Sequence, residues 1–193
     1  MSETEKETLA YVVGVAIGDG NLSNPNGRAT RLRITCDKKY SLLIDRIRKA
    51  IQVVLPQNKV SLQHRTETYL DISCYSNKWE GLLGWKVGQG SKYDQNVSVP
   101  TWIKQNKKYS TYCLKGLLET DGCIYMDRGY KMVNFVTIIP DLAHDVMSII
   151  SDLGFRAHLY DMQPKGFNCK RRYNIRVSKN VENFIQKINL IKN

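Results

Sequence analysis

Two apolar segments that end in the same Asp-Gly pair constrain this chain more than any other feature. The first reads VVGVAIGDG over residues 12–20, and the second reads LKGLLETDG over residues 114–122. Each segment has small residues four positions apart, which lie on one face of a helix. These small residues are Gly14 and Gly18 in the first copy and Gly116 and Thr120 in the second. The pattern predicts two helices whose backbones approach closely, each stopped by the glycine after its aspartate.

The aspartates of the two copies, Asp19 and Asp121, are the candidate functional residues. If the two small faces pack in parallel, both carboxylates emerge together at the C-terminal ends of the helices. Two carboxylates beside two negative helix ends repel one another, and a divalent cation would relieve this. Oxygen ligands suit a hard ion such as Mg²⁺, so we expect a metal-dependent site for phosphodiester hydrolysis. Each segment taken alone is better explained as a buried apolar helix that ends in an ordinary Asp-Gly turn. The repeat, the matched small residues and the basic composition together favour the metal site instead.

The charge of the chain indicates a polyanionic partner. Its 29 Lys and Arg residues against 18 Asp and Glu give a net charge of +11. Residues 1–98 carry 14 basic and 10 acidic side chains, and residues 99–193 carry 15 and 8, so both halves are basic. No apolar run is long enough to span a membrane, and the acidic start is unlike a signal peptide. We expect an intracellular protein, cytoplasmic in a prokaryote or organellar, and not a secreted one.

The cysteines and histidines do not form a metal site of their own. The five cysteines are scattered without a C-x-x-C pair, and the three histidines show no H-E-x-x-H pattern. They are typical of reduced residues in an intracellular protein, and neither a zinc site nor a histidine-based nuclease centre is supported.

Hydrophobic periodicity predicts the same order of elements twice, namely helix, hairpin, helix, hairpin and helix. In the first half we expect helices at residues 8–18, 39–54 and near 79–83, and strands at 21–23, 31–35, 59–64 and 68–74. In the second half we expect helices at residues 109–120, 140–153 and 180–190, and strands at 123–127, 131–137, 156–162 and 170–177. The halves are therefore residues 1–98 and 99–193, joined by a glycine-containing connection at about 84–98, in an α+β fold.

Three details of this pattern are open to a structural test. Leu32 and Ile34 alternate with polar residues and should face the core of the first half. Trp85, in the connection, should pack that segment down rather than stack on a base. The helix at 39–54 should bury one apolar stripe, made of Leu42, Leu43, Ile47, Ile51 and Val54.

At this point the residues resemble a known family, the LAGLIDADG homing endonucleases in their single-chain, two-motif form. The match spans nearly the whole chain, and LKGLLETDG is the stronger motif. The segments VPTWI at 99–103, DLA at 141–143 and LGF at 153–155 also look like that family, including its intein-borne members. An intein is disfavoured, because the chain starts with Met1 and ends at Lys192-Asn193 without room for flanking splicing blocks.

The resemblance implies two αββαββα halves around a pseudo-twofold axis, with the motif helices as their interface. Each four-stranded sheet would then form part of a saddle in the DNA major groove. The family cuts one phosphodiester on each strand across the minor groove of a long, asymmetric site and leaves short 3′ overhangs. The acids of the two motifs hold the metal, here Asp19 and Asp121, with the backbone carbonyls of Gly18 and Thr120 as further ligands. Mg²⁺ is the expected cofactor, Mn²⁺ should substitute, and Ca²⁺ should bind without supporting cleavage.

The resemblance also points to residues around the metal. Some members have a lysine just past the last strand of a half, which here corresponds to Lys179, a catalytic candidate whose alternative is a solvated lysine at a helix start. Members often have glutamine at the end of the second strand, where this chain has Cys36 and Ile138. That element is missing here or is replaced by Asp37 or Lys38.

Strand residues of alternating parity are the candidates for DNA recognition, since one face of each sheet would meet the bases. In the first half they are Asn21, Ser23, Arg31, Arg33, Thr35, Gln63, Arg65, Asp71 and Ser73. In the second half they are Tyr125, Asp127, Lys131, Val133, His158, Arg171, Tyr173 and Arg176.

The leading hypothesis is a monomeric, sequence-specific endonuclease that acts on double-stranded DNA and has no membrane partner. One alternative is an intron maturase of the same fold, with intron RNA as its partner. Another is a non-catalytic DNA-binding regulator, although that alternative predicts the loss of one or both motif acids, and both are present.

Overall fold

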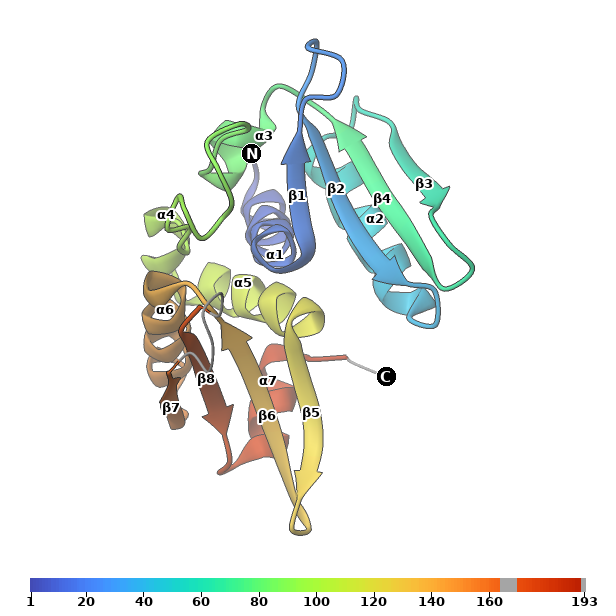
Figure 1. Cartoon of the computed structure of the whole chain (residues 1–193). Helices are drawn as coiled ribbons and strands as arrows, with labels where there is room; N and C mark the ends of the chain where they lie inside the picture. Colours follow the sequence, from blue (N-terminus) through green and yellow to red (C-terminus); the bar gives the residue numbers. More distant parts are fainter. Residues whose placement is uncertain (164–169, 192–193) are drawn as a thin grey trace.

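Two helices form the centre of the molecule, between two β-sheets (Figure 1). The computed structural model describes residues 1–163 and 170–191, and these two helices are α1 (Glu3–Asp19) and α5 (Lys107–Thr120). A Cβ atom added to Gly14 would lie 2.1 Å from the backbone oxygen of Cys113, and one added to Gly116 would lie 2.4 Å from the backbone oxygen of Tyr11. The two backbones are therefore in direct contact, as the small residues of the two motifs predicted.

The sheets are arranged in the same way in the two halves. All neighbouring strands are antiparallel, and the strand orders are β1-β2-β4-β3 and β5-β6-β8-β7. The strands of the first sheet are β1 (Gly20–Ser23), β2 (Arg31–Asp37), β3 (Val60–His64) and β4 (Tyr69–Tyr75). The strands of the second are β5 (Gly122–Asp127), β6 (Tyr130–Thr137), β7 (Ala157–Met162) and β8 (Arg172–Val177). The α+β fold with an internal repeat is confirmed.

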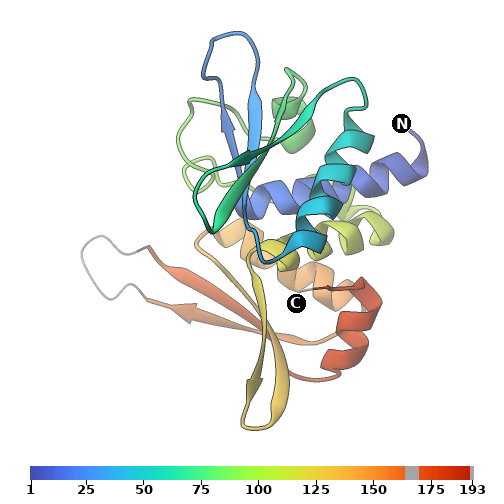
Figure 2. The same ribbon diagram turned by 90° about the vertical axis from the view of Figure 1, so that its right-hand side faces the viewer.

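The remaining helices are α2 (Ser41–Val54), α3 (Trp79–Leu83), α4 (Thr101–Lys104), α6 (Pro140–Asp152) and α7 (Val181–Ile188). Of these helices, α2 covers the first sheet and α6 and α7 cover the second, while α3 packs on α1 and α4 packs on α5. After a turn of 90°, the blue β1–β2 hairpin points up and the yellow β5–β6 hairpin points down, with α2 and α7 to the right of them (Figure 2). Leu32 and Ile34 are fully buried, as predicted.

The expected stripe of α2 was partly wrong. Leu42 is 67% exposed, and the residues of α2 that are buried are Ile44, Ile47, Ala50 and Ile51. These four residues recur three or four positions apart and define one helix face, whereas Leu42 lies off that face in the first turn.

The glycines that end the motif helices are required for space, which corrects the expected reason for them. Gly20 has φ −76° and ψ 146°, an extended conformation open to any residue. A Cβ at Gly20 would lie 2.5 Å from the carbonyl oxygen of Ala16, and one at Gly122 would lie 2.5 Å from that of Leu118. In each half the chain therefore folds directly back from helix to strand over the last helical turn.

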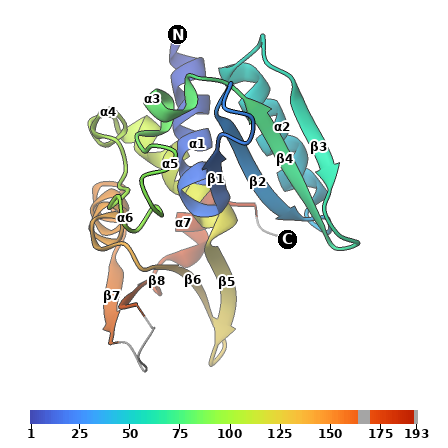
Figure 3. The ribbon, with the colours of Figure 1, turned by 45° about the horizontal axis from the view of Figure 1, so that its top comes forward.

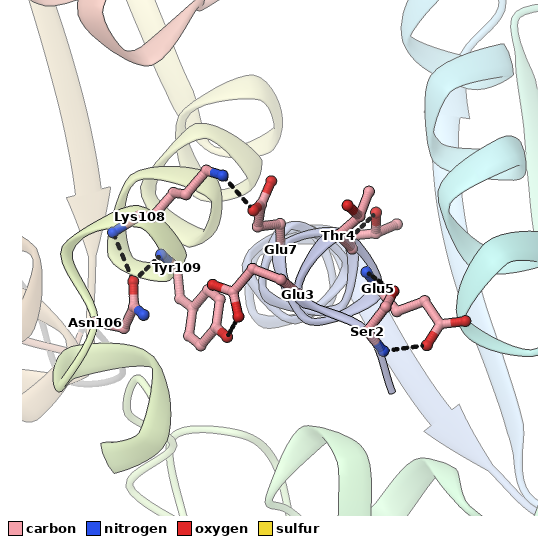
Figure 4. A network of polar contacts seen from close by, with 9 residues as sticks. Ser2, Glu3, Thr4, Glu5, Glu7, Asn106, Lys108 and Tyr109 are labelled. Atoms are coloured by element: carbon pink, nitrogen blue, oxygen red, sulfur yellow. Dashed lines mark hydrogen bonds and ion pairs between the residues drawn. The ribbon is translucent and has the colours of Figure 1, made fainter.

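The N-terminal ends of α1 and α5 are tied by polar contacts (Figure 4). The helix α1 begins at Glu3, five residues before the expected start, because Ser2 and Glu5 form a capping box. Tyr109 donates a hydrogen bond of 2.8 Å to the Glu3 carboxylate, and Lys108 forms an ion pair of 2.5 Å with Glu7. The acidic start of the chain is thus part of the interface between the halves.

A buried carboxylate connects three of the helices. Glu119 on α5 is 1% exposed and accepts a hydrogen bond of 2.7 Å from the hydroxyl of Tyr11 on α1. It also pairs with Arg46 on α2, and Lys115 lies 3.9 Å away. Burial and the Glu119 charge hold the pKa of Tyr11 well above its ordinary value of 10. Removing Glu119 would leave a buried hydroxyl and cations without their acceptor.

We expect the stability of the fold to fall at alkaline pH. Burial raises the pKa of Tyr11, and it raises that of the Cys113 thiol above its ordinary value of 9. Above about pH 9 the unfolded chain therefore loses protons that the folded chain keeps, so each such group destabilises the fold by up to about 1.4 kcal/mol per pH unit. Urea unfolding at pH 8 and pH 10.5 tests this, and Cys113→Ala should flatten the decline. Equal stability at the two pH values would contradict it.

The connection between the halves packs closely on the protein. Trp85 is 4% exposed, so it packs the segment down as predicted. Figure 3 shows this green segment passing beside α1 on its way from α3 to α4. Among the described residues, no helix combines the length and the apolar character needed to cross a bilayer.

Candidate metal centre and nucleic-acid interface

The two motif aspartates lie at the paired C-terminal ends of the central helices. Asp19 is the last residue of α1, and Asp121 directly follows α5. The Asp121 Oδ2 atom lies 3.2 Å from the point that a Cβ on Gly18 would occupy, so this carboxylate reaches across to the other helix. Both aspartates are exposed. The parallel packing expected from the sequence therefore brings the two acids to one site.

A lysine that the sequence did not reveal lies at this site. The ammonium group of Lys92, in the connection between the halves, donates hydrogen bonds to the carbonyl oxygens of Ala16 at 3.2 Å, Ile17 at 2.5 Å and Gly18. Burial lowers the pKa of Lys92, while the charges of Asp121 and Asp19 raise it. The Lys92 ammonium therefore contacts the end of α1 and lies within electrostatic range of both carboxylates. No pattern in the sequence around residue 92 signals this position.

The donor atoms at the site fit a hard divalent cation. They are the carboxylates of Asp19 and Asp121 and the carbonyl oxygens at the end of α1. The Lys92 ammonium already binds those carbonyls, which shows that they accept a positive charge. Within the described ranges 1–163 and 170–191, no group of three or more His, Cys, Asp or Glu side chains could hold a metal. All-oxygen donors favour Mg²⁺, Mn²⁺ or Ca²⁺ over zinc.

A cavity of about 390 Å³ opens beside Asp121. Its lining includes Gly18, Lys92 and Asp121, the residues 136–139 at the end of β6, and Arg172 at the start of β8. Arg172 is therefore the strand arginine that the structure brings to the candidate centre.

Lys179, the expected catalytic lysine, lies elsewhere. Gly122 pairs with Phe135, and Phe135 pairs with Ile175, so the middle of β8 is level with the residue that follows Asp121. Lys179 follows the C-terminal end of β8, and four residues of strand span roughly 13 Å. The catalytic role proposed for Lys179 is thus corrected by the strand register, which the sequence did not settle.

The positions expected to hold glutamine give no substitute for it. Cys36 is buried, and burial together with the charges of Asp19 and Asp71 raises its pKa to about 12. Lys38 donates a hydrogen bond of 2.7 Å to the backbone oxygen of Thr66, and Asp37 accepts one of 3.0 Å from the backbone of Lys39. Lys38 is therefore bound to the turn between β3 and β4, and Asp37 to its own loop.

The register of the first sheet places its predicted recognition residues on one face. Arg33 pairs with Asn21 and Ser73, and Thr35 pairs with Asp71, so these side chains point the same way. Asp71 and Ser73, expected to be exposed, are 8% and 2% exposed. They lie on the central strand β4, where Asp71 accepts a hydrogen bond of 2.7 Å from Thr35 and has Arg33 and Arg65 4.0 Å away.

Half of the recognition residues expected in the second sheet face the wrong way. Tyr125, Asp127, His158 and Arg176 lie on the open face, whereas four others do not. These four are Lys131, which pairs with Glu182 of α7, Val133 and Tyr173, which are buried, and Arg171, which pairs with Asp161. The two-residue turn at Arg128-Gly129 pairs Asp127 with Tyr130, so odd positions on β5 face the same way as even positions on β6.

The open faces also contain buried polar atoms that lack hydrogen-bond partners in the described part of the chain. They are Arg33 Nε on the first sheet and Asn134 Oδ1, Asn174 Oδ1 and Arg176 Nε on the second. Asn134 pairs with Arg176, and Asn174 pairs with Tyr160, so these side chains share the open face. The correct strand parity would have identified both asparagines, which the sequence analysis missed.

A family comparison supports the motif reading. Residues 108–189 match the model of the LAGLIDADG-like domain. Curated relatives include the tRNA-splicing ligase RtcB of Methanopyrus kandleri, which is 25% identical over 97% of this chain and 21% of its own length. They also include the ribonucleoside-diphosphate reductase NrdEB subunit alpha of Bacillus subtilis, 22% identical over 87% of this chain and 17% of its own length. This chain therefore spans about a fifth of the length of these relatives.

Solved structures share the complete fold. Mesophilic variants of the homing endonuclease I-DmoI match with a TM-score of 0.70 and 19% identity, over 96% of this chain and 97% of that one. I-DmoI in complex with DNA and Mn matches with a TM-score of 0.69 and 20% identity, over 95% and 97%. Full-length DUF199/WhiA of Thermatoga maritima matches with a TM-score of 0.66 and 11% identity, over 99% of this chain and 58% of that chain.

Proposed function

The chain has the two-motif LAGLIDADG fold, with a LAGLIDADG-like domain in its C-terminal half, and from this premise we propose that it is a divalent-metal-dependent, sequence-specific DNA endonuclease. The observation that carries the proposal is the meeting of Asp19 and Asp121 at the ends of two helices in backbone contact. The matching solved structures, I-DmoI and WhiA alike, are at most 20% identical and show the fold alone, so the acid pair is what supports cleavage.

In this proposal the chain supplies oxygen ligands for the metal and holds the DNA duplex in a fixed orientation. Asp19 and Asp121 hold the metal with the backbone carbonyls of Gly18 and Thr120. A bound divalent ion supplies an activated water and stabilises the leaving oxygen. Each acid comes from a different half, so each half faces one DNA strand across the pseudo-twofold axis. The paired acids form one site, at which both strands are cut.

The open faces of the two sheets are proposed to read the DNA. A two-stranded ribbon fits the major groove, and Arg and Asn side chains there pair with guanine and adenine edges. The polar atoms of Arg33, Asn134, Asn174 and Arg176 that lack hydrogen-bond partners in the described part of the chain support this, since base edges would satisfy them. The excess of Lys and Arg would hold phosphates and make the binding dependent on salt concentration.

The curated relatives narrow the proposal in one respect. A further relative is the replicative DNA helicase DnaB of Rhodothermus marinus, which is 31% identical over 51% of this chain and 11% of its own length. The chemistry of this helicase is unrelated to that of the tRNA-splicing ligase and the ribonucleotide reductase subunit. What this chain shares with them is a minor part of each. We therefore infer an independent module and propose none of those three activities for it.

Selection from a randomised DNA library is the direct test of the proposed function. The protein is incubated with the library in Mg²⁺, in Mn²⁺ and in EDTA, and cut ends are sequenced. We expect cuts at one long, asymmetric site with both metals and none in EDTA. Tight binding to DNA without cutting would favour the regulator, and tighter binding to structured intron RNA would favour the maturase.

The asparagines of the second sheet should contribute to specificity. Asn134→Ala is expected to relax the preference at one base pair of the selected site, at a cost of about 1–3 kcal/mol in binding. Lys131→Ala is the matched control, because Lys131 is on the same strand, β6, but faces α7. Site selection with each variant measures this, and a preference changed equally by both would contradict the assigned face.

A further inference from the structure

Lys92 occupies a position that a metal would also use. Its ammonium group contacts three consecutive carbonyl oxygens at the end of α1, and the last of these belongs to Gly18, a proposed metal ligand. The Ala16 oxygen also accepts a hydrogen bond from the backbone N–H of Gly20. The main hydrogen bonds of Lys92 are therefore those to the oxygens of Ile17 and Gly18.

The segment around Lys92 is anchored to the other half of the molecule. Ser91 and Asp94 close a tight turn through hydrogen bonds of 2.7 and 2.8 Å. The Lys170 ammonium lies 3.5 Å from the centre of the Tyr93 ring, and Asn96 donates a hydrogen bond of 2.5 Å to Asp141 of α6. Lys92 therefore reaches α1 of the first half from a support on the second half.

The charges at the end of α1 attract a cation. The last turn of α1 has no basic residue of its own, and the C-terminal end of a helix carries partial negative charge. Asp19 and Asp121 add two carboxylates to the same place. Lys92 supplies the positive charge from another part of the chain, at an oxygen that suits a hard metal ion.

We propose that Lys92 is a built-in counter-ion of the aspartate pair, which a divalent cation displaces from the Gly18 carbonyl when it binds. This inference rests on the proposed metal site. Because the segment 91–96 is anchored to the second half, a displaced ammonium stays beside the centre. The metal-free protein is thus stabilised by its own lysine, and metal binding competes with that contact.

Calorimetry and thermal unfolding with Ca²⁺ or Mn²⁺ alone, without DNA, test this competition. Lys92→Met should bind either metal about tenfold more tightly than the wild type, since a charged hydrogen-bonding competitor is gone. Its metal-free form should melt at a lower temperature and gain more from added metal. Lys92→Gln keeps a hydrogen-bond donor without the charge and provides the same test if Lys92→Met does not fold.

Arg172→Met is the matched control, because Arg172 lines the same cavity without a role in the carbonyl contacts of Lys92. It removes one positive charge, so it should tighten metal binding less than Lys92→Met. Equal effects of the two variants, or unchanged or weaker metal binding by Lys92→Met, would overturn the displacement. If the wild type, Lys92→Met and Asp121→Asn all bind no metal, the proposed metal site fails together with this inference.

Discussion

Asp121→Asn is expected to slow DNA cleavage by about a thousandfold or more, with DNA binding retained. An amide cannot supply the negative charge that holds a divalent ion, and losing several kcal/mol of transition-state stabilisation costs that factor. Asp121 reaches over Gly18 of the other motif helix. We therefore expect both strands to be cut more slowly, which labelling each strand of the selected site would measure.

Asp152→Asn is the control for this substitution. Asp152 is exposed at the end of α6 and undergoes the same change of charge and shape, so its cleavage rate should match that of the wild type. If Asp121→Asn slowed only one strand, the two acids would serve separate centres. If it cut both strands at the wild-type rate, the site proposed here would be wrong.

Gly14→Ala should destabilise the fold by about 3 kcal/mol, although alanine is the better helix former. Its Cβ would lie 2.1 Å from the backbone oxygen of Cys113, which cannot rotate away as a side chain would. The helices must separate or lose hydrogen bonds. For a chain of this size we expect the melting temperature to drop by about 6–12 °C.

Gly81→Ala is the control, because Gly81 is also helical but has no atom within 4 Å of the added methyl group. It should be neutral or stabilising by up to about 1 kcal/mol. Thermal unfolding of both variants decides between close backbone packing and a simple preference for alanine. If Gly14→Ala were as stable as Gly81→Ala, the contact between α1 and α5 would be looser than described.

The sequence predicted the elements that are determined by local residue patterns and that occur in both halves. The motif helices and their small faces follow from spacing, and the approach of Asp19 to Asp121 follows once the two small faces pack in parallel. The faces of β1 and β2 were also predictable, because Leu32 and Ile34 alternate with arginines and both are fully buried. Such strands have one apolar side and one polar side.

The second sheet shows where this reasoning stops. Its strands mix apolar and polar residues on both faces, so parity could not be read from hydrophobicity, and Lys131 and Val133 were assigned to the wrong side. Only the length of the turn at Arg128-Gly129 fixes the register. Lys179 was misplaced for a related reason, since which end of a strand approaches the centre is a property of sheet topology.

Lys92 could not be predicted, because its role depends on contacts between distant segments. Its partners are 74 to 76 residues away in the chain, and the turn that presents it is supported by residues of the second half. A lysine in a connection between halves has no spacing that distinguishes it from a solvated one.

The backbone contact between α1 and α5 also has a consequence for the products of the proposed reaction. Because the two backbones are in contact at Gly14 and Gly116, the acids have little freedom to move apart. The offset between the two nicks is then a property of the scaffold, whereas the bases at the site are chosen by the sheets. Variants selected for new targets should therefore leave ends of unchanged length, ready to be joined to fragments cut by the parent.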